Sequence, residues 1–138
     1  DLVLDGCDNF ETRYLVNQFC KKLNTPLISA SAVGFTGQLL MVEGDSACYE
    51  CLFSQNSNIN QQDNDEIRCA ETGVLATTPN VIASLQAHHA LLYLGLNLTP
   101  LKQKLLLWDG LSMKQRLLAY ETDRDCPICQ ARQSANAD

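Results

Sequence analysis

The residues with the clearest chemistry in this sequence are four cysteines arranged as two Cys-x-x-Cys pairs. The first pair is Cys48 and Cys51, and the second is Cys126 and Cys129. Two thiolates separated by two residues can bind one metal ion from a single turn, and two such pairs complete the tetrahedral sulfur set of a structural zinc site. The spacing therefore predicts a structural Zn²⁺ that fastens the C-terminal segment to the middle of the chain.

The same cysteines leave two alternatives open, which are disulfide bonds and a thiol redox site. The chain has 7 cysteines, an odd number, and zinc binding would leave Cys7, Cys20 and Cys69. An odd number of cysteines, three of them left outside the metal site, is more typical of a protein in a reducing compartment than of a secreted protein held by disulfides. A redox protein would place one pair at the start of a helix, and no helix start is predicted directly after Cys51.

The composition is that of one globular domain with an acidic balance of charge. The chain has 138 residues, of which 46% are hydrophobic, and a net charge of -6 with a pI near 4.7. Nucleic-acid and membrane-surface proteins need basic patches, and no apolar run reaches the length of a membrane span. We therefore expect neither a nucleic-acid nor a membrane partner, and we expect a cytoplasmic protein.

The apolar pattern of the first half predicts an α/β fold that begins with a parallel strand. Residues 2–4 form a short apolar run typical of such a strand. A helix follows, and residues 26–33 and 38–42 then predict the two strands of a hairpin. The helix is expected to bury an apolar stripe that consists of Leu15, Val16, Phe19, Cys20 and Leu23.

The second half predicts a long helix and a second hairpin. The helix spans about residues 79–94, and its leucines and alanines predict burial on much of its circumference. The hairpin pairs residues 104–109 with residues 114–120. Residues 54–66 contain one apolar side chain and are expected to form a mobile, functional loop. Residues 131–138 are small and polar and are expected to form a flexible tail.

Two further positions are candidates for chemistry. Asp8 and Asn9 follow the first strand, and ligands of α/β sheets bind at the carboxyl ends of strands, where an Asp can hold a Mg²⁺ that bridges phosphates. The alternative is that Asp8 is the N-cap of the helix in a capping box with Glu11. Cys69 follows the polar loop beside Arg68, a position that favours the thiolate and a thioester or persulfide link, although an isolated loop cysteine is more often inert.

These motifs together resemble the ThiF/MoeB/HesA family of ubiquitin-activating-enzyme-like adenylyltransferases. The resemblance extends over nearly the whole chain, with the segments in family order. The matching segments are residues 5–13 (Asp5-Gly6-Cys7-Asp8-Asn9-Phe10-Glu11-Thr12-Arg13), Gly37-Gln38, 48–53, 69–74, 84–87, Trp108-Asp109-Gly110 and 126–129.

The resemblance implies a Rossmann-like adenylation domain with a mixed sheet, antiparallel hairpins and a structural zinc site with four cysteine ligands. It implies that Mg²⁺ and ATP are used to adenylate the C-terminal glycine of a ubiquitin-like sulfur carrier ending in Gly-Gly, for thiamine or molybdopterin biosynthesis, by a homodimer. Asp8 would lie near the triphosphate and Mg²⁺, with Asn9 beside the nucleotide. Cys69 matches the cysteine that some members link covalently, and residues 54–66 match the crossover loop.

The resemblance also implies that part of the family's nucleotide site lies outside this sequence. The glycine-rich loop, the ribose-binding acid and the phosphate-binding Arg and Lys have no counterpart in it, and the first residues already belong to a predicted strand. Residues 1–130 are therefore expected to be the C-terminal part of an adenylation domain that is inactive by itself. The alternative is a zinc-stapled interaction module without catalysis.

Overall fold

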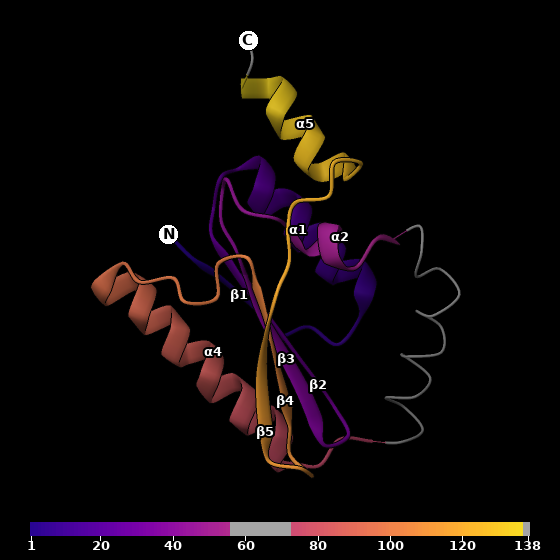
Figure 1. The fold of residues 1–138 in the computed structure, drawn as a ribbon, viewed down its shortest axis with the longest axis vertical. Coiled ribbons are helices and arrows are strands. Elements are labelled where there is room, and N and C mark those ends of the chain that lie inside the picture. The colour runs from indigo at the N-terminus through magenta and orange to yellow at the C-terminus, as the bar shows by residue number, and fades with distance from the viewer. Residues whose placement is uncertain (56–72, 137–138) are drawn as a thin grey trace.

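The computed structural model describes residues 1–55 and 73–136, which form a five-stranded mixed sheet with helices on its two faces (Figure 1). The strands are β1 (Val3–Asp5), β2 (Leu27–Val33), β3 (Thr36–Val42), β4 (Lys104–Asp109) and β5 (Lys114–Ala119). The helices are α1 (Phe10–Lys22), α2 (Tyr49–Leu52), α4 (Thr77–Leu96) and α5 (Pro127–Asn136). The strand order is β1-β2-β3-β4-β5, and only the β1–β2 pair is parallel. The predicted mixed α/β sheet with two hairpins is confirmed.

Glycines allow the first hairpin to turn and to lie close to a helix. Gly34 has a φ of 59° in the two-residue connection between Val33 and Thr36, and a positive φ suits the turn types of such short hairpins. Gly37 lies directly under α4, because a Cβ at this position would collide with the side chain of Ile82. The absence of a side chain at Gly37 thus lets α4 pack against β3.

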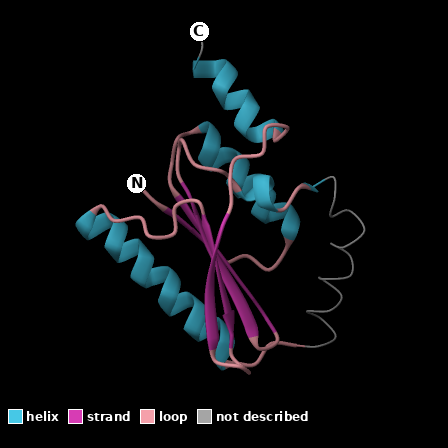
Figure 2. Cartoon of the chain, viewed as in Figure 1, coloured by secondary structure: helices cyan, strands magenta, loops and turns pink. Residues whose placement is uncertain are grey.

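The core has two parts, one on each face of the sheet, because alternate strand residues point to opposite faces. On the face shared with α1 and α2, Leu40 and Val42 of β3 pack with Tyr14 and Tyr49. On the opposite face, Leu39 and Met41 of the same strand pack with Ile82 of α4 and other apolar residues. Figure 2 shows these helices on opposite sides of the strands.

Helix α1 buries only part of the apolar stripe that the sequence predicts. Leu15, Phe19 and Leu23 are 52%, 51% and 68% exposed. The prediction holds for Cys20, which is buried, and for Val16, which packs against the core. It is wrong for the other three residues, because polar side chains of α1 find partners inside the fold and no described element covers the outer apolar side. The buried residues of α1 are Arg13, Tyr14, Asn17, Cys20 and Lys21.

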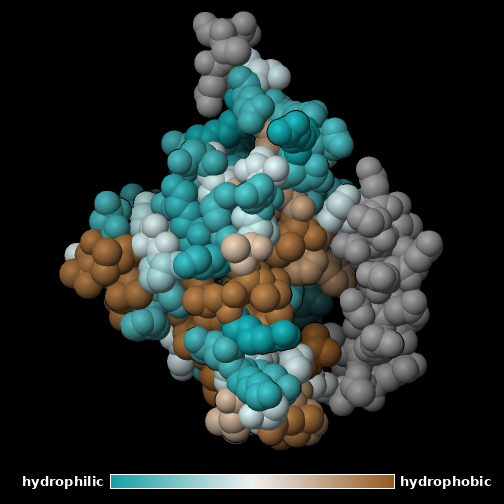
Figure 3. Space-filling model, in the orientation of Figure 1, coloured by the Kyte–Doolittle hydropathy of each residue, from teal (hydrophilic) through white to brown (hydrophobic). Residues whose placement is uncertain are grey.

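Helix α4 is also more exposed than its composition predicts. It buries about one residue per turn against the sheet, namely Thr78, Ile82, Gln86 and Ala90. Leu91, Leu94 and Leu96 are 70%, 60% and 65% exposed. A hydrophobic patch is visible over the C-terminal end of α4 in the space-filling view (Figure 3). The expectation of burial around much of this helix is therefore not met within the described chain.

The C-terminal segment is helical where the sequence predicts a flexible tail. Helix α5 continues to Asn136, and the Nη2 atom of Arg132 donates a hydrogen bond to Asn24 Oδ1 at 2.8 Å. The predicted loop at 54–66 lies outside the described residues except for Ser54 and Gln55. None of the helices in the described part of the chain has the length and apolar character needed to cross a membrane.

Candidate functional site

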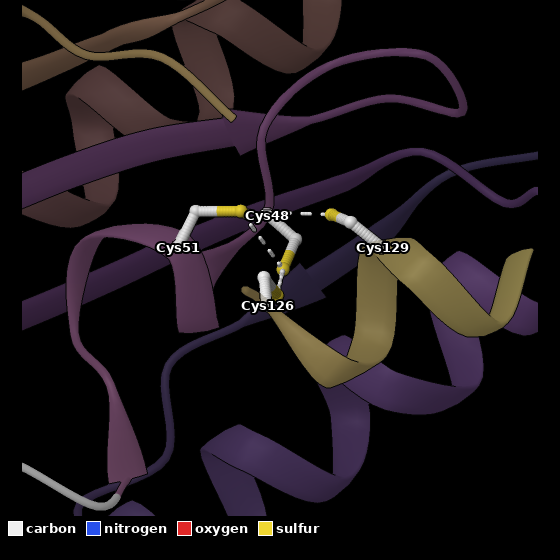
Figure 4. A group of neighbouring side chains, drawn as sticks. All are labelled: Cys48, Cys51, Cys126 and Cys129. Atoms are coloured by element: carbon white, nitrogen blue, oxygen red, sulfur yellow. Dashed lines mark hydrogen bonds between the residues drawn. The ribbon is translucent and has the colours of Figure 1, made fainter. Parts of the chain in front are cut away.

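The four cysteines of the two Cys-x-x-Cys pairs come together in one cluster (Figure 4). Their sulfur atoms all lie within 4.8 Å of one another. The Cys48 and Cys51 sulfurs are 3.8 Å apart, Cys48 and Cys126 are 3.6 Å apart, and Cys51 and Cys129 are 3.5 Å apart. Sequence-distant pairs therefore converge as the spacing predicts.

The geometry of this cluster fits zinc better than disulfides. A tetrahedral Zn²⁺ with Zn–S bonds of about 2.3 Å separates its sulfur ligands by about 3.8 Å, close to the observed distances. A disulfide needs a separation of about 2.0 Å, and all four cysteines are free thiols here. Cys48, Cys126 and Cys129 are also buried. The donor set therefore fits a closed structural zinc site.

Both cysteine pairs lie at the starts of helices, which corrects one part of the sequence argument. Cys48 is the N-cap of α2, and α5 begins at Pro127, directly after Cys126. The absence of a helix start therefore does not argue against a redox site. The convergence of four sulfurs argues against it, because a redox pair works with two.

The thiols of the cluster influence one another's protonation. Hydrogen bonds with the neighbouring thiols, first with Cys126, lower the pKa of Cys51. The hydrogen bond with Cys126 raises the pKa of Cys129. One thiolate is thus stabilised by neighbouring thiols, and a metal ion would have to displace the remaining protons.

Two tyrosines connect the cysteine cluster to α1. The backbone N–H of Tyr49 in α2 donates to Asn17 Oδ1 at 3.0 Å, and the ring of Tyr49 lies edge-on to that of Tyr14, with ring centres 5.4 Å apart. The Tyr14 hydroxyl donates to the carbonyl oxygen of Phe53 at 2.6 Å. The segment that carries Cys48 and Cys51 is therefore fixed to the helix that follows β1.

A buried ionic network lies at the carboxyl end of β1. Asp5 is 6% exposed and lies 3.9 Å from the Nη1 atom of Arg13. Arg13 donates to Ser29 Oγ at 3.1 Å, to the Ala30 carbonyl at 2.9 Å and to the Cys7 carbonyl at 2.5 Å. Asp5 accepts from the Cys7 N–H at 2.9 Å. This network holds the turn that leads to Asp8 and joins it to the middle of β2.

Asp8 is exposed at this turn, and Asn9, not Asp8, is the N-cap of α1. Asn9 Oδ1 accepts a hydrogen bond from the N–H of Thr12 at 2.8 Å, so the capping box predicted for Asp8 and Glu11 is wrong. Asp8 is exposed, and among the described residues its carboxylate accepts one long contact, of 3.5 Å, from Asn9 Nδ2. Asp8 is therefore available to a ligand at the carboxyl end of a parallel strand.

The described cysteines outside the cluster are poor candidates for nucleophiles. Cys7 lies in the same turn as Asp8, but burial raises the pKa of its thiol to about 11, which makes it a weak nucleophile. Cys20 is buried in α1. Cys69, the predicted covalent residue, lies outside the described residues, so its place relative to Asp8 stays a prediction.

Sequence reasoning missed several buried polar residues that hold the site together. Gln86 of α4 donates to the carbonyls of Asp5 and Ile28 at 3.0 and 2.9 Å, and it thereby joins the carboxyl end of β1 to the beginning of β2 from the opposite face. Arg13, Asn17 and Lys21 recur every four residues of α1. That period places them on one helix face, and it is the signal that could have identified them.

The comparisons with known proteins agree with this architecture. The family model described as the ThiF family matches residues 1–128. The chain is 40% identical over 131 residues to the sulfur carrier protein ThiS adenylyltransferase of Escherichia coli, covering 94% of the chain and 49% of that protein. It is 35% identical to the SAMP-activating enzyme E1 of Haloferax volcanii, covering 94% of the chain and 46% of that protein.

A solved structure supports the same relationship. The crystal structure of E. coli MccB with ATP matches with a TM-score of 0.75 at 25% identity, covering 94% of this chain and 39% of that one. The chain thus spans about half the length of the curated relatives it matches. With the family model matching most of its residues and both relatives matching at more than 30% identity, the chain belongs to the ThiF family.

Proposed function

We propose that this chain is the C-terminal part of an ATP-dependent adenylyltransferase acting on the C-terminal glycine of a ubiquitin-like sulfur carrier. The product would serve sulfur transfer in thiamine or molybdopterin biosynthesis. The names of the relatives support an adenylyltransferase of sulfur carriers. The observation that carries the proposal is the exposed Asp8 carboxylate at the carboxyl end of β1, on a turn held by Arg13.

Asp8 and Asn9 would contribute to the nucleotide site. The Asp8 carboxylate would hold the Mg²⁺ that accompanies ATP, because carboxylate oxygens are the ligands this ion prefers. Mg-ATP would supply the adenylyl group and release pyrophosphate. The hydrogen bonds of Arg13 keep the turn in place without using the Asp8 carboxylate, which stays available to the metal ion. Cys69 would then accept the activated carrier or take part in sulfur transfer.

The four cysteines would hold a structural Zn²⁺ outside the nucleotide site. Leu27, at the start of β2, pairs both with Val3 of β1 and with Val42, the last residue of β3. The last residue of β3 therefore lies level with the start of β1, away from the carboxyl end of β1 at Asp5. Cys48 follows that end of β3 after a short turn. A zinc ion there would fasten α5 to α2 and α1, and it would not contact the reacting phosphates.

The missing part of the nucleotide site would come from residues upstream in a longer protein. Two observations support this. The edge of β1 has no partner strand among the described residues, and the apolar side of α1 at Leu15, Phe19 and Leu23 is exposed. Such a surface is suited to burial against further sheet and helix. Without it, the 138 residues would not adenylate a substrate.

The protein would work as a cytoplasmic homodimer. Leu91, Leu94 and Leu96 of α4 form an exposed apolar surface, as expected of a helix near a contact between copies. The free thiols of the chain suit a reducing compartment.

The test is carrier-dependent exchange of pyrophosphate into ATP by the longer protein. Asp8→Ala should lower the exchange rate by roughly 100-fold or more, because a group that stabilises charge in the transition state is lost. Glu11→Ala is the matched control, since it removes an exposed acid three residues away and should change the rate by less than about threefold. Cys69→Ser should leave exchange intact and impair only later transfer. Wild-type exchange in Asp8→Ala would refute the assigned role.

A non-catalytic interaction module is the second candidate. Strand β5 is exposed along its whole length and lies at the edge of the sheet, with Leu117 and Leu118 50% and 44% exposed. An open edge strand can pair with a partner chain. This function predicts carrier binding that is independent of nucleotide and no exchange in the longer protein.

A further inference from the structure

Lys21 of α1 is a buried lysine that takes no part in the proposed nucleotide site and is not one of the four clustered cysteines' ligand groups. Lys21 is 3% exposed. Its ammonium donates to the backbone carbonyls of Glu43 at 3.3 Å, Gly44 at 3.0 Å and Ser46 at 2.6 Å. An ammonium has three N–H groups, and all three are used. A buried charge is tolerated when it is hydrogen-bonded in this way.

The three carbonyls belong to one turn, and this turn leads directly to the first metal ligand. β3 ends at Val42, and Cys48 follows Ser46 after a single residue. Inside the turn, Ser46 Oγ accepts from the N–H of Glu43 at 2.8 Å. The next N–H, that of Ala47, donates to Gln103 Oε1 at 2.5 Å. The path of the chain into Cys48 is therefore set by side chains from other elements, with Lys21 making the most contacts.

Helix α5 lies close to the same turn through Arg132. A Cβ on Gly44 would collide with Asn24 Oδ1, and it would lie 2.7 Å from Nη2 of Arg132. Arg132 belongs to the helix that starts at the second cysteine pair. The turn thus contacts Lys21 of α1 and lies close to Arg132 of α5, so its position relates the two cysteine pairs to each other.

We propose that Lys21 is a positioning residue of the zinc centre, because it fixes the turn at residues 43–46 so that Cys48 and Cys51 meet the second pair. This inference rests on the zinc site proposed above. Groups that hydrogen-bond directly to metal ligands are worth about 10- to 100-fold in metal affinity, and Lys21, which acts through the turn before Cys48, is expected to contribute at the lower end, about 10-fold.

The test compares Lys21→Met with Lys22→Met in the full chain. Lys22 is the adjacent lysine and is exposed, so its variant controls for the loss of one positive charge on α1. Zinc affinity is measured by competition with a chromophoric chelator, under conditions in which circular dichroism shows both variants folded. Lys21→Met should bind zinc at least about 10-fold more weakly, and Lys22→Met should match the wild type. Cobalt-substituted Lys21→Met should also show altered visible d–d bands.

The outcomes separate a metal role from general stabilisation. If Lys21→Met loses stability to urea but keeps wild-type zinc affinity and cobalt bands, Lys21 only supports the fold and the proposal is overturned. If Lys21→Met does not fold, Lys21→Arg replaces it, because it keeps the charge but cannot direct three N–H groups into one tight turn, and weaker zinc binding is again expected. A wild type that binds no zinc would instead overturn the metal site itself.

Discussion

Replacing Arg13 with methionine should strongly destabilise the protein, because it leaves a buried carboxylate without its ionic partner. Arg13 and Asp5 are 5% and 6% exposed, and their charged groups lie 3.9 Å apart. The substitution also leaves the carbonyls of Cys7 and Ala30 without the N–H groups that now bind them. Methionine preserves much of the side-chain volume, so the loss comes mainly from charge and hydrogen bonding.

The size of the effect follows from the partners that remain. Breaking a buried ion pair by removing one partner costs about 3–5 kcal/mol. Asp5 keeps hydrogen bonds from the Cys7 N–H and the Ser29 hydroxyl, so we expect the lower end, about 3 kcal/mol. With a urea m-value of about 2 kcal/mol/M, the midpoint of unfolding should fall by about 1.5 M.

The assay is equilibrium urea unfolding followed by circular dichroism. Gln18→Met is the matched control, since Gln18 is an exposed polar residue on the same helix and its change should be within about 0.5 kcal/mol. The double variant Asp5→Asn with Arg13→Met should be less destabilised than the sum of the two single variants, because no unpaired charge remains. A loss of less than about 1 kcal/mol in Arg13→Met would refute the reasoning.

Three further outcomes are expected. Asn9→Ala should lower the free energy of unfolding by about 1 kcal/mol because it removes the helix cap, whereas Asp8→Ala should leave urea stability unchanged. Gly37→Ala should cost about 1–3 kcal/mol because its Cβ collides with Ile82, and Gly6→Ala, with open space around it, should cost less in the same assay. Three of the four ligand thiols have raised pKa values, so zinc must displace their protons. Its affinity, measured by chelator competition, should therefore fall as the pH decreases, by roughly tenfold per pH unit for each proton released.

The strands, the hairpins and the convergence of the two cysteine pairs could be predicted because their signals are local. Two Cys-x-x-Cys pairs predict one tetrahedral site whatever the fold between them. Apolar runs bounded by turn residues predict the strands at residues 26–33 and 104–109, and the observed strands differ from these by at most one residue at either end.

The buried face of α1 could not be predicted because its partners are distant in sequence. Lys21 binds the turn at residues 43–46, and Asn17 binds the N–H of Tyr49. Periodicity analysis treats such polar residues as the solvent side of a helix. In this chain, tertiary hydrogen bonds make them the inner side, and the apolar residues Leu15 and Phe19 stay exposed.

The sequence contained a local signal for the C-terminal helix, but the small polar composition of the segment pointed to a flexible tail instead. Pro127 occupies the first position of α5, where proline is favoured, but the small polar residues that follow suggest a frayed end. A contact with a residue far away in the sequence, between Arg132 and Asn24, supports the helix. The N-cap was misassigned for a related reason, since Asp8 and Asn9 are both good caps and only the structure distinguishes them.

The most direct test of the zinc centre is the metal content of the purified chain, combined with X-ray absorption at the zinc edge. We expect one zinc per chain with four sulfur neighbours at about 2.3 Å, and three thiols, those of Cys7, Cys20 and Cys69, outside the metal. A chain that contains no zinc and instead forms disulfides within the Cys48–Cys51 or Cys126–Cys129 pairs would contradict the metal centre and the positioning role of Lys21.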